Sequence, residues 1–250
     1  MREQTHIVVG LGEVGAALAD VLSVGAGNRI VGVDPAKKCY ADGLEPGADF
    51  LHVCIPFGPS FIEAVNAYIV HLDPEIVVVH STVPVGTTRE LAGGDAVHSP
   101  VEGLHPHLKE SILTFCKHFG GKNATAAAAP FAALGIKTKT HNKPETTELQ
   151  KLLGTSWYGI ALMVAREQAT ICRQLGLSYQ EVVQGYTKDY NDGYAALDHA
   201  HFTRPILYPP TGKLGGHCVA QNLPLLVKSV PGLAPIHEML GRYNNGLPDR

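Results

Sequence analysis

Short apolar runs rich in β-branched residues alternate with helical patterns through the first half of the chain. The runs are HIVVG, RIVGV, FLHVCIP, EIVVVH and DAVHS, followed by the weaker TFCKHFG and IKTKT. Between them, AALADVLSV, SFIEAVNAYIVHL and NATAAAAPFAALG place apolar residues three and four positions apart, as a helix packed on a sheet requires. This alternation predicts βαβ units and an α/β fold with a doubly wound parallel sheet. Segment 34–50 is short for a full helix and strand, so a strand is expected to be trimmed there.

The texture of the sequence changes near residue 143. The segment KPETTELQKLLGTSWYGIALMVAREQATICRQLG predicts one long helix that begins near Pro144 and ends at Gly176. Ser178 is the expected N-cap of a short helix, and a loop rich in Pro and Gly leads to another helix that begins near His217. We therefore expect a sheet domain over 1–142 and a smaller all-helical domain, built on the long helix, over 143–250.

A glycine-rich motif follows the first apolar run directly and precedes a helical pattern. Gly10 permits a tight turn, Gly12 lets the backbone approach a pyrophosphate, and Gly15 lets the helix pack on the strand. Asp34 ends the next strand, where a carboxylate binds the ribose of a dinucleotide and favours NAD over NADP. The context predicts a Rossmann domain that binds NAD; without it, these would be ordinary turn glycines.

Two further motifs place reactive groups at the ends of elements. The segment STVPVGTT follows an apolar strand, and ligands of open α/β sheets bind at the carboxyl ends of strands. A simple Pro/Gly turn is the alternative. In GGHC, Cys218 stands at or near a helix start, where backbone amides lower a thiol's pKa. A lone cysteine is more often a small buried hydrophobe, and this interpretation suits the other four, Cys39, Cys54, Cys116 and Cys172.

Composition narrows the class of protein. Hydrophobic residues make up 45% of the chain and charged residues 17%, with no biased tract, which is typical of a globular protein. A net charge of -3 with scattered Lys and Arg gives no basic footprint for nucleic acid. No leader precedes the first strand and no apolar run approaches the ~20 residues of a membrane span, so we expect a cytoplasmic protein without a membrane partner. Neither the five cysteines nor the thirteen histidines have the spacing of a metal site, so we expect no metal.

Together these pieces resemble the UDP-glucose/GDP-mannose dehydrogenase family. The motifs GLGEVG, HVCIPFG, STVPVGTT, SPVEG, TELQKLL and GGHC occur in the family's order, and STVPVGTT and GGHC are the most specific. The family oxidises the primary alcohol of a nucleotide sugar to a carboxylate in two NAD-dependent hydride transfers, through a thiohemiacetal and a thioester on a cysteine. The resemblance therefore implies an NAD-dependent dehydrogenase that acts on CH-OH groups of a small, sugar-like substrate.

The resemblance also implies roles for individual residues. Cys218 matches the nucleophile, and a thiolate suits this role because it traps an aldehyde and yields a thioester that water can hydrolyse. Lys151 matches the lysine that stabilises the oxyanion, although alone it would be interpreted as a solvated helix lysine. Thr82 matches the threonine that helps to position water, and Glu102, after a one-residue shift of SPVEG, matches the glutamate base. The expected cofactor-binding residues are Gly10, Gly12, Glu13, Val14, Gly15, Asp34, Pro56, Ser81 and Thr82.

The sequence departs from the family at two catalytic positions and in length. Thr155 stands where the family has an asparagine, and Asn222 stands where it has an aspartate, which weakens the acid/base and oxyanion apparatus of a two-step oxidation. We also expect this chain to lack the family's third domain, which holds the substrate's nucleotide. Contacts to the substrate are then expected from the loop before Cys218, although such a loop can equally be merely solvated; these residues are Arg204, Tyr208, Lys213, Gly215 and Gly216.

Two other functions fit the same residues. Thr155 and Asn222 suit a catalytically impaired NAD-binding protein that serves as a regulatory or binding subunit. A β-hydroxyacid or prephenate-type dehydrogenase also has a Rossmann domain followed by helices, but it needs a hydride-aligned Lys or His rather than a thiol.

The long helix also bears on oligomeric state. It carries apolar residues on more than one face, which is typical of a buried helix. In so small a helical domain a partner subunit is the natural cover, and the family dimerises through the matching helix, so we expect a homodimer. Burial within one chain is the alternative.

Overall fold

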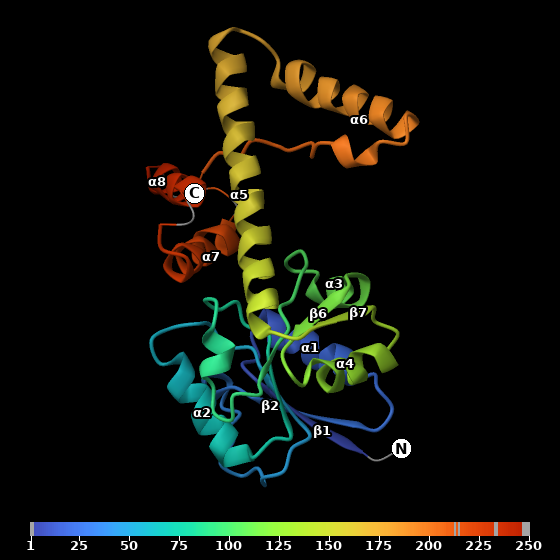
Figure 1. Ribbon diagram of the computed structural model, residues 1–250, viewed down its shortest axis with the longest axis vertical. Coiled ribbons are helices and arrows are strands. Elements are labelled where there is room, and N and C mark those ends of the chain that lie inside the picture. Colours follow the sequence, from blue (N-terminus) through green and yellow to red (C-terminus); the bar gives the residue numbers. More distant parts are fainter. Residues whose placement is uncertain (1–2, 213, 215, 233–234, 247–250) are drawn as a thin grey trace. The chain divides into compact units, whose positions relative to one another are not determined.

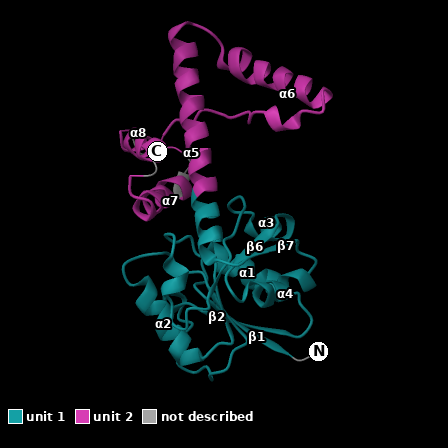
Figure 2. Cartoon of the chain, viewed as in Figure 1, with its two compact units in different colours: residues 1–152 teal, residues 153–250 magenta. Residues whose placement is uncertain are grey.

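The computed structural model describes residues 3–212, 214, 216–232 and 235–246. The chain divides into two compact units, residues 1–152 and 153–250, which we call unit 1 and unit 2 (Figure 2). Helix α5 (Pro144–Gln174) contributes to both, because its first turns lie in unit 1. The boundary predicted between residues 142 and 143 lies at the start of this helix, and the units divide further along it.

Unit 1 is built on a seven-stranded sheet with the order β2-β1-β3-β4-β5-β6-β7 (Figure 1). The first five strands in sequence pair with one another in parallel. The strands are β1 (Gln4–Val9), β2 (Asn28–Val33), β3 (Phe50–Val53), β4 (Ile76–Val79), β5 (Val97–His98), β6 (Lys117–Gly120) and β7 (Thr138–His141).

Helices cover both faces of this sheet, which explains why both faces of its inner strands are buried. In β4, Val77 and Val79 belong to one buried cluster and Val78 to another. The first cluster includes residues of α2 (Phe61–Leu72), and the second includes residues of α1 (Glu13–Leu22), α3 (Leu108–Thr114) and α4 (Ala124–Ala133). The doubly wound α/β fold predicted from the alternating pattern is confirmed.

Two connections of the sheet differ from a regular βαβ unit. Between β2 and β3 there is no α-helix, only the 3-10 turn η1 (Pro35–Lys37) and a bridge between Asp34 and Cys39. The short segment predicts a trimmed strand, whereas the structure keeps β3 and lacks the helix. The strands β5 and β6 are antiparallel rather than parallel. The chain between them therefore starts and ends at the same end of the two strands and does not cross over the sheet. The parallel pairing resumes between β6 and β7.

The regular elements described in unit 2 are all helical, and a segment without regular structure, residues 203–210, connects two of them. Leu162 and Met163 of α5 pack in one buried cluster with Val219, Leu223 and Leu240. Gly159 makes the approach close, because a Cβ there would lie 2.7 Å from a Val219 methyl group. After α5 the elements are η3 (Gln180–Gly185), a π-helical turn, then α6 (Tyr186–Ala196), η4 (Ala200–Phe202), α7 (Gly216–Ser229) and α8 (Pro235–Asn245).

The predicted stop and start signals after α5 are present. Gly176 adopts a φ of 70°, in the left-handed region that suits glycine after a helix. The Ser178 hydroxyl then accepts a hydrogen bond from the Glu181 amide at 3.4 Å, as an N-cap does. Within the residues described, no helix is both long enough and apolar enough to cross a membrane.

Candidate functional site

The glycine-rich loop joins β1 to α1, and its three glycines differ in the space around them. Gly10 adopts a φ of 88°, and a Cβ there would lie 2.8 Å from the Cys54 carbonyl oxygen. A Cβ on Gly15 would lie 1.8 Å from the Gly10 oxygen, so the helix packs against the loop only with glycine at this position. Gly12 is the N-cap of α1, and a Cβ there would have no atom within 4 Å. The loop is therefore open at Gly12, where a helix N-terminus suits a phosphate.

Two residues predicted to bind the cofactor follow Gly12 directly. Glu13 is exposed in the first turn of α1 and its carboxylate is hydrogen-bonded to His105 Nδ1. The Val14 side chain packs against the buried cluster beneath α1. Of these two residues, the structure therefore uses Val14 for packing, while the Glu13 side chain remains at the rim of the loop.

Asp34, at the end of β2, connects two loops through its carboxylate. One oxygen accepts a hydrogen bond from the Leu11 amide at 2.9 Å, and the other accepts one from the Ala36 amide at 3.0 Å. Each carboxylate oxygen retains a second lone pair that can accept a further bond. Asp34 thus lies beside the glycine loop, as the predicted role at a ribose requires.

The carboxyl ends of β3 and β4 carry the other predicted cofactor residues. Pro56 is exposed just after β3 and lines a shallow pocket of about 290 Å³. The Ser81 hydroxyl, which follows β4, donates to the Ile55 oxygen at 2.6 Å and so ties the two loops together. Thr82 is half-buried next to it.

Glu148 anchors the STVPVGTT loop, a role that sequence analysis missed. Its buried carboxylate accepts hydrogen bonds from the Gly86 amide at 2.6 Å and the Thr88 amide at 2.9 Å. Burial raises the pKa of this carboxyl, and the bonds from Thr88 and Gly86 act in the opposite direction. The signal in the sequence was an acidic residue inside TELQKLL, on the helix turn that also carries Lys151.

Lys151 and Glu102, both predicted to be catalytic, lie together in unit 1. The Lys151 ammonium donates to the Val101 oxygen at 2.7 Å and to a Glu102 carboxylate oxygen at 3.2 Å. The Lys151 side chain is 16% exposed and that of Glu102 is 51% exposed. The pair therefore presents a fixed ammonium beside a carboxylate that solvent and substrates can reach.

Cys218 lies in the first turn of α7 and is exposed. All five cysteines fall within the described residues, and the other four are half-buried or buried. Burial raises the pKa of the Cys54 thiol to about 12, so it stays protonated at neutral pH. Cys218 is accordingly the thiol most accessible to a ligand.

Thr155 and Asn222, the two departures from the family pattern, contact each other. The Asn222 side-chain amide, which is buried, donates to the Thr155 hydroxyl at 3.3 Å. The contact joins α5 to α7 within unit 2. Two changes that lie 67 residues apart in sequence thus form one neutral pair in the structure.

The predicted substrate-binding residues fall into three groups. The Arg204 guanidinium stacks on the Tyr190 ring of α6 at 3.8 Å, and Tyr208 is 78% exposed. Gly216 begins α7. Lys213 and Gly215 lie outside the described residues. Among the residues that the structure describes, no group of three or more His, Cys, Asp or Glu side chains could hold a metal ion.

No protein family model matches the chain. Among curated proteins it is similar to UDP-N-acetyl-D-mannosamine dehydrogenase of Methanococcus vannielii, with 22% identity over 267 residues, 85% of this chain and 58% of that protein. The chain thus spans little more than half the length of this relative. The relationship confirms the resemblance to nucleotide-sugar dehydrogenases that the motifs indicate.

Solved structures of low sequence identity share the fold. UDP-D-ManNAc dehydrogenase from Pyrococcus horikoshii superposes with a TM-score of 0.80 at 18% identity, over 97% of this chain and 68% of that one. 3-Hydroxyisobutyrate dehydrogenase from Mycobacterium tuberculosis superposes with a TM-score of 0.66 at 18% identity, over 98% of this chain and 93% of that one. Both confirm the Rossmann-like fold with a helical part.

Proposed function

We propose that this chain, a relative of the nucleotide-sugar dehydrogenases, is an NAD-dependent oxidoreductase that oxidises a primary alcohol or aldehyde of a sugar-like substrate. Cys218 is its nucleophile. The observation that carries this proposal is the exposed thiol of Cys218 in the first turn of α7, in a chain whose other cysteines are at least half-buried. Its exposure lets the carbon of a substrate reach the sulfur.

The loop around Gly12 fits the pyrophosphate of NAD. The space beside the Gly12 Cα is empty, so a phosphate can approach the backbone there. The Asp34 carboxylate lies beside this loop, and its oxygens can accept a further hydrogen bond from a ribose hydroxyl. A 2'-phosphate would meet the charge of Asp34, which favours NAD over NADP. When bound, NAD supplies the hydride acceptor. The remaining proposed cofactor contacts come from Glu13, Val14, Pro56, Ser81 and Thr82.

The proposed chemistry divides among three residues. Cys218 adds its sulfur to the aldehyde carbon to give a thiohemiacetal. Loss of a hydride, which bound NAD would accept, and of the hydroxyl proton, which Glu102 would take, converts this to a thioester, and water cleaves the thioester to a carboxylate and the free thiol. Lys151 stabilises the oxyanion that develops at this carbon. Glu102, bonded to Lys151 at 3.2 Å, takes the proton from the alcohol or from water. Arg204 and Tyr208 are the described residues that we propose for contacts to the substrate.

The neutral Thr155–Asn222 pair favours a second candidate, a catalytically impaired NAD-binding subunit. An amide one helical turn beyond Cys218 cannot act as a base, so hydrolysis of a thioester would lose assistance there. The superposition on 3-hydroxyisobutyrate dehydrogenase keeps a hydroxyacid substrate as a third candidate.

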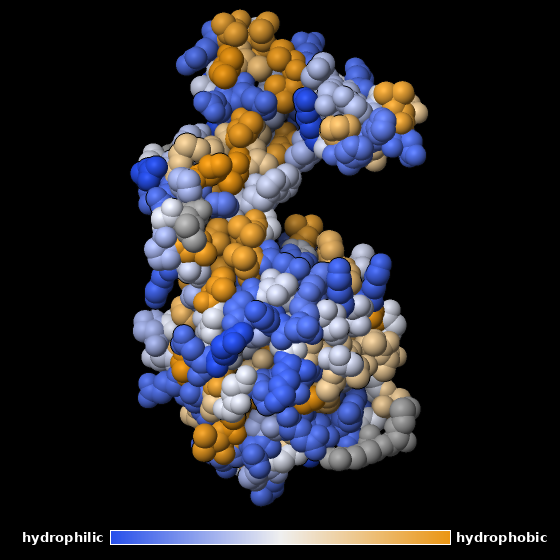
Figure 3. Space-filling view, in the orientation of Figure 1, coloured by the Kyte–Doolittle hydropathy of each residue, from blue (hydrophilic) through white to orange (hydrophobic). Residues whose placement is uncertain are grey.

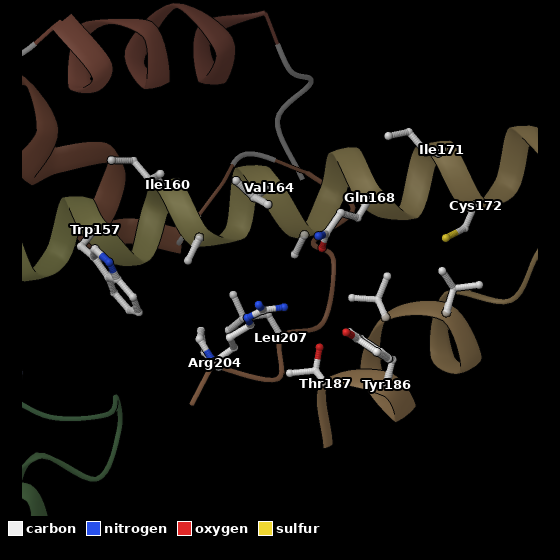
Figure 4. A pocket seen from close by; sticks show the side chains of 15 residues that line it. Trp157, Ile160, Val164, Gln168, Ile171, Cys172, Tyr186, Thr187, Arg204 and Leu207 are labelled. Carbon is white, nitrogen blue, oxygen red and sulfur yellow. The ribbon is translucent and has the colours of Figure 1, made fainter. Parts of the chain in front are cut away.

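We further propose that the protein is a homodimer through α5. Trp157, Val164 and Ile171 of this helix are 58%, 44% and 50% exposed in the single chain. Apolar residues, drawn in orange, gather on the surface where Figure 1 shows α5 (Figure 3). In unit 2, α5, α6 and the segment that carries Arg204 also surround a largely apolar pocket of about 540 Å³ (Figure 4). Exposed apolar surface of this kind marks an interface.

The proposal is tested by following NADH formation with a panel of UDP- and GDP-sugars, free sugars and small hydroxy acids. We expect turnover with a nucleotide sugar, and a loss of roughly a thousandfold or more in Cys218→Ala because the covalent route is removed. Cys39→Ala is the matched control and is expected to leave turnover unchanged, since this half-buried thiol donates to the Lys37 oxygen at 3.6 Å and has no role in the proposed chemistry.

The two other candidates give different results in the same assays. Turnover of a hydroxy acid that survives in Cys218→Ala would establish the hydroxyacid dehydrogenase. A shift in melting temperature with NAD, without turnover on any substrate, would establish the binding subunit.

A further inference from the structure

Three buried histidines form a hydrogen-bonded line across the sheet of unit 1. His6 lies in β1, His52 in β3, and His80 follows β4. His6 Nδ1 is 3.0 Å from His52 Nε2, and His52 Nδ1 is 3.0 Å from His80 Nε2. All three are at most 3% exposed. We call them the histidine line.

The histidine line ends at a buried lysine of β6. The Lys117 ammonium lies 3.3 Å from His80 Nδ1 and is 5% exposed. The aromatic rings of Phe119 and Phe131 lie 5.5 and 5.4 Å from it. Lys117 is therefore surrounded by imidazoles and rings, an environment in which a charge must be stabilised by dipoles.

Those dipoles belong to the loop that carries Glu102. Lys117 donates to the Ser99 oxygen at 3.1 Å and to the Pro100 oxygen at 3.3 Å. Lys151 donates to the next carbonyl, that of Val101, at 2.7 Å. Two ammonium groups thus hold three consecutive carbonyls immediately before Glu102, and hydrogen bonds from a charged donor are about twice as strong as neutral ones.

The proton positions in the histidine line depend on the charge of Lys117. A neutral imidazole carries one N–H, and each contact between two rings needs one donor and one acceptor. The three rings therefore either all carry their proton on Nδ1 or all carry it on Nε2. In the first arrangement His80 Nδ1 donates to the Ser99 oxygen at 2.7 Å. In the second, His80 Nδ1 accepts from the Lys117 ammonium. A charged Lys117 can only donate and so favours the second arrangement, whereas a neutral amine can also accept and so permits the first. The charge of Lys117 is therefore coupled to the proton positions of the line.

Burial is the main cause that lowers the pKa of Lys117, to about 7. Burial also lowers the pKa values of His52 and His80 well below their usual range, so these rings are neutral when Lys117 is charged. The titratable groups that face Lys117 come from several elements: His52, Cys54, His80, His98, Glu102, His118 and Lys151.

We propose that Lys117 is a positioning residue, whose ammonium holds the segment 99–102 so that Glu102 and Lys151 are aligned, and whose protonation is linked to the histidine line. The catalytic part of this inference rests on the proposed function. The positioning itself is a property of unit 1 that can be measured without substrate.

The first test is the pH dependence of thermal stability for wild type and Lys117→Met. The pKa of Lys117 is lower in the folded chain than its usual 10.5, so between about pH 7 and 10.5 the unfolded chain binds more protons. The melting temperature of wild type minus that of the variant is therefore expected to rise from about pH 7 to about pH 9. Lys122→Met is the matched control, because Lys122 is a 75% exposed lysine nearby in sequence. Parallel curves for wild type and Lys117→Met would overturn the inference.

The second test measures the loop directly by hydrogen exchange of segment 99–104. At about pH 6, where Lys117 is charged, exchange is expected to be about tenfold faster in Lys117→Met than in Lys122→Met, and the difference is expected to shrink by about pH 9. Equal exchange in the two variants at the lower pH would overturn the positioning role. These readouts do not depend on turnover.

The third test separates this inference from the proposed function. With an active substrate, Lys117→Met is expected to lower kcat/KM at least about tenfold while leaving the affinity for NAD unchanged. Unchanged kcat/KM, with altered exchange, would overturn the catalytic part alone. Absence of turnover in wild type would overturn the proposed function and with it the catalytic part, while the stability and exchange results would still decide the positioning role.

Discussion

At the scale of single residues, Gly15 and Gly12 show how one short loop combines a strict packing requirement with open space. A side chain at Gly15 would penetrate the carbonyl oxygen of Gly10, because the added carbon would stand only 1.8 Å from it. Gly12, three residues earlier, faces open space. The first position determines whether the helix can dock on the strand, and the second whether a ligand can approach the helix.

The two glycines therefore give opposite expectations on substitution by alanine. Gly15→Ala is expected to destabilise the fold by about 1–3 kcal/mol or more, because the backbone must move. Gly12→Ala is expected to lower the melting temperature by only a few degrees, since alanine at an N-cap costs about 1 kcal/mol or less relative to glycine, yet to bind NAD at least about tenfold more weakly. Thermal melts and calorimetric titration with NAD measure both. Wild-type NAD affinity in Gly12→Ala would contradict the proposal that the glycine-rich loop binds the pyrophosphate of NAD.

At the scale of elements, the first turns of α5 support a loop of the sheet domain. Glu148 holds two amides of the STVPVGTT loop, and Thr147 contacts His98 through its hydroxyl at 2.8 Å. Glu145, one turn earlier, forms an ion pair with Arg89 at 2.6 Å. The helix start is thus tied to unit 1 by one buried carboxylate and one more exposed carboxylate.

The same substitution at each position compares how much the two carboxylates contribute to the free energy of unfolding. Glu148→Gln is expected to lower the free energy of unfolding by about 1–3 kcal/mol, because one of two buried amides faces an NH₂ group instead of an acceptor. Glu145→Gln removes an ion pair that is partly exposed, and is expected to cost about 0–1 kcal/mol. Urea unfolding at constant pH gives both values. Equal losses in the two variants would show that Glu148 is no special anchor.

The elements themselves were largely predictable, and the exceptions have physical reasons. Apolar runs and helical spacing identify the strands and helices, but periodicity carries no direction, so the reversal of β6 was not predicted. An acidic residue early in a helix is expected from the helix dipole, which concealed the long-range role of Glu148. His80 ends the run EIVVVH and was interpreted as a strand end, whereas the structure buries it in the histidine line.

The candidate site was predictable only where a motif names the residue. Lys151 and Glu102 each came from a motif, and their contact joins positions 49 residues apart. Lys117 had no such signal, because a lysine in the weak run TFCKHFG is indistinguishable from a lysine on an exposed strand. Its burial results from Phe119 and Phe131, which only the folded chain brings against it.

At the scale of the whole molecule, the proposed dimer can be tested with two exposed valines. Val164→Glu places a charge on α5 beside the apolar pocket and is expected to shift the protein from dimer to monomer, with a loss of roughly tenfold or more in association. Val70→Glu, at a 78% exposed valine of α2, is the matched control and is expected to leave the mass unchanged. Light scattering after size exclusion measures both. A wild-type monomer would contradict the dimer.

The division of the chain inside α5 has a consequence for where the sheet half can be separated from the rest of the chain. The start of this helix supplies Glu148 to the amides of one loop and Lys151 to the carbonyl of another, and both loops belong to the sheet half. A fragment that ended with the last strand would keep the glycine-rich loop but lose the two side chains that hold its neighbouring loops. We therefore expect the sheet half to keep these loops in place only when it retains the opening turns of α5.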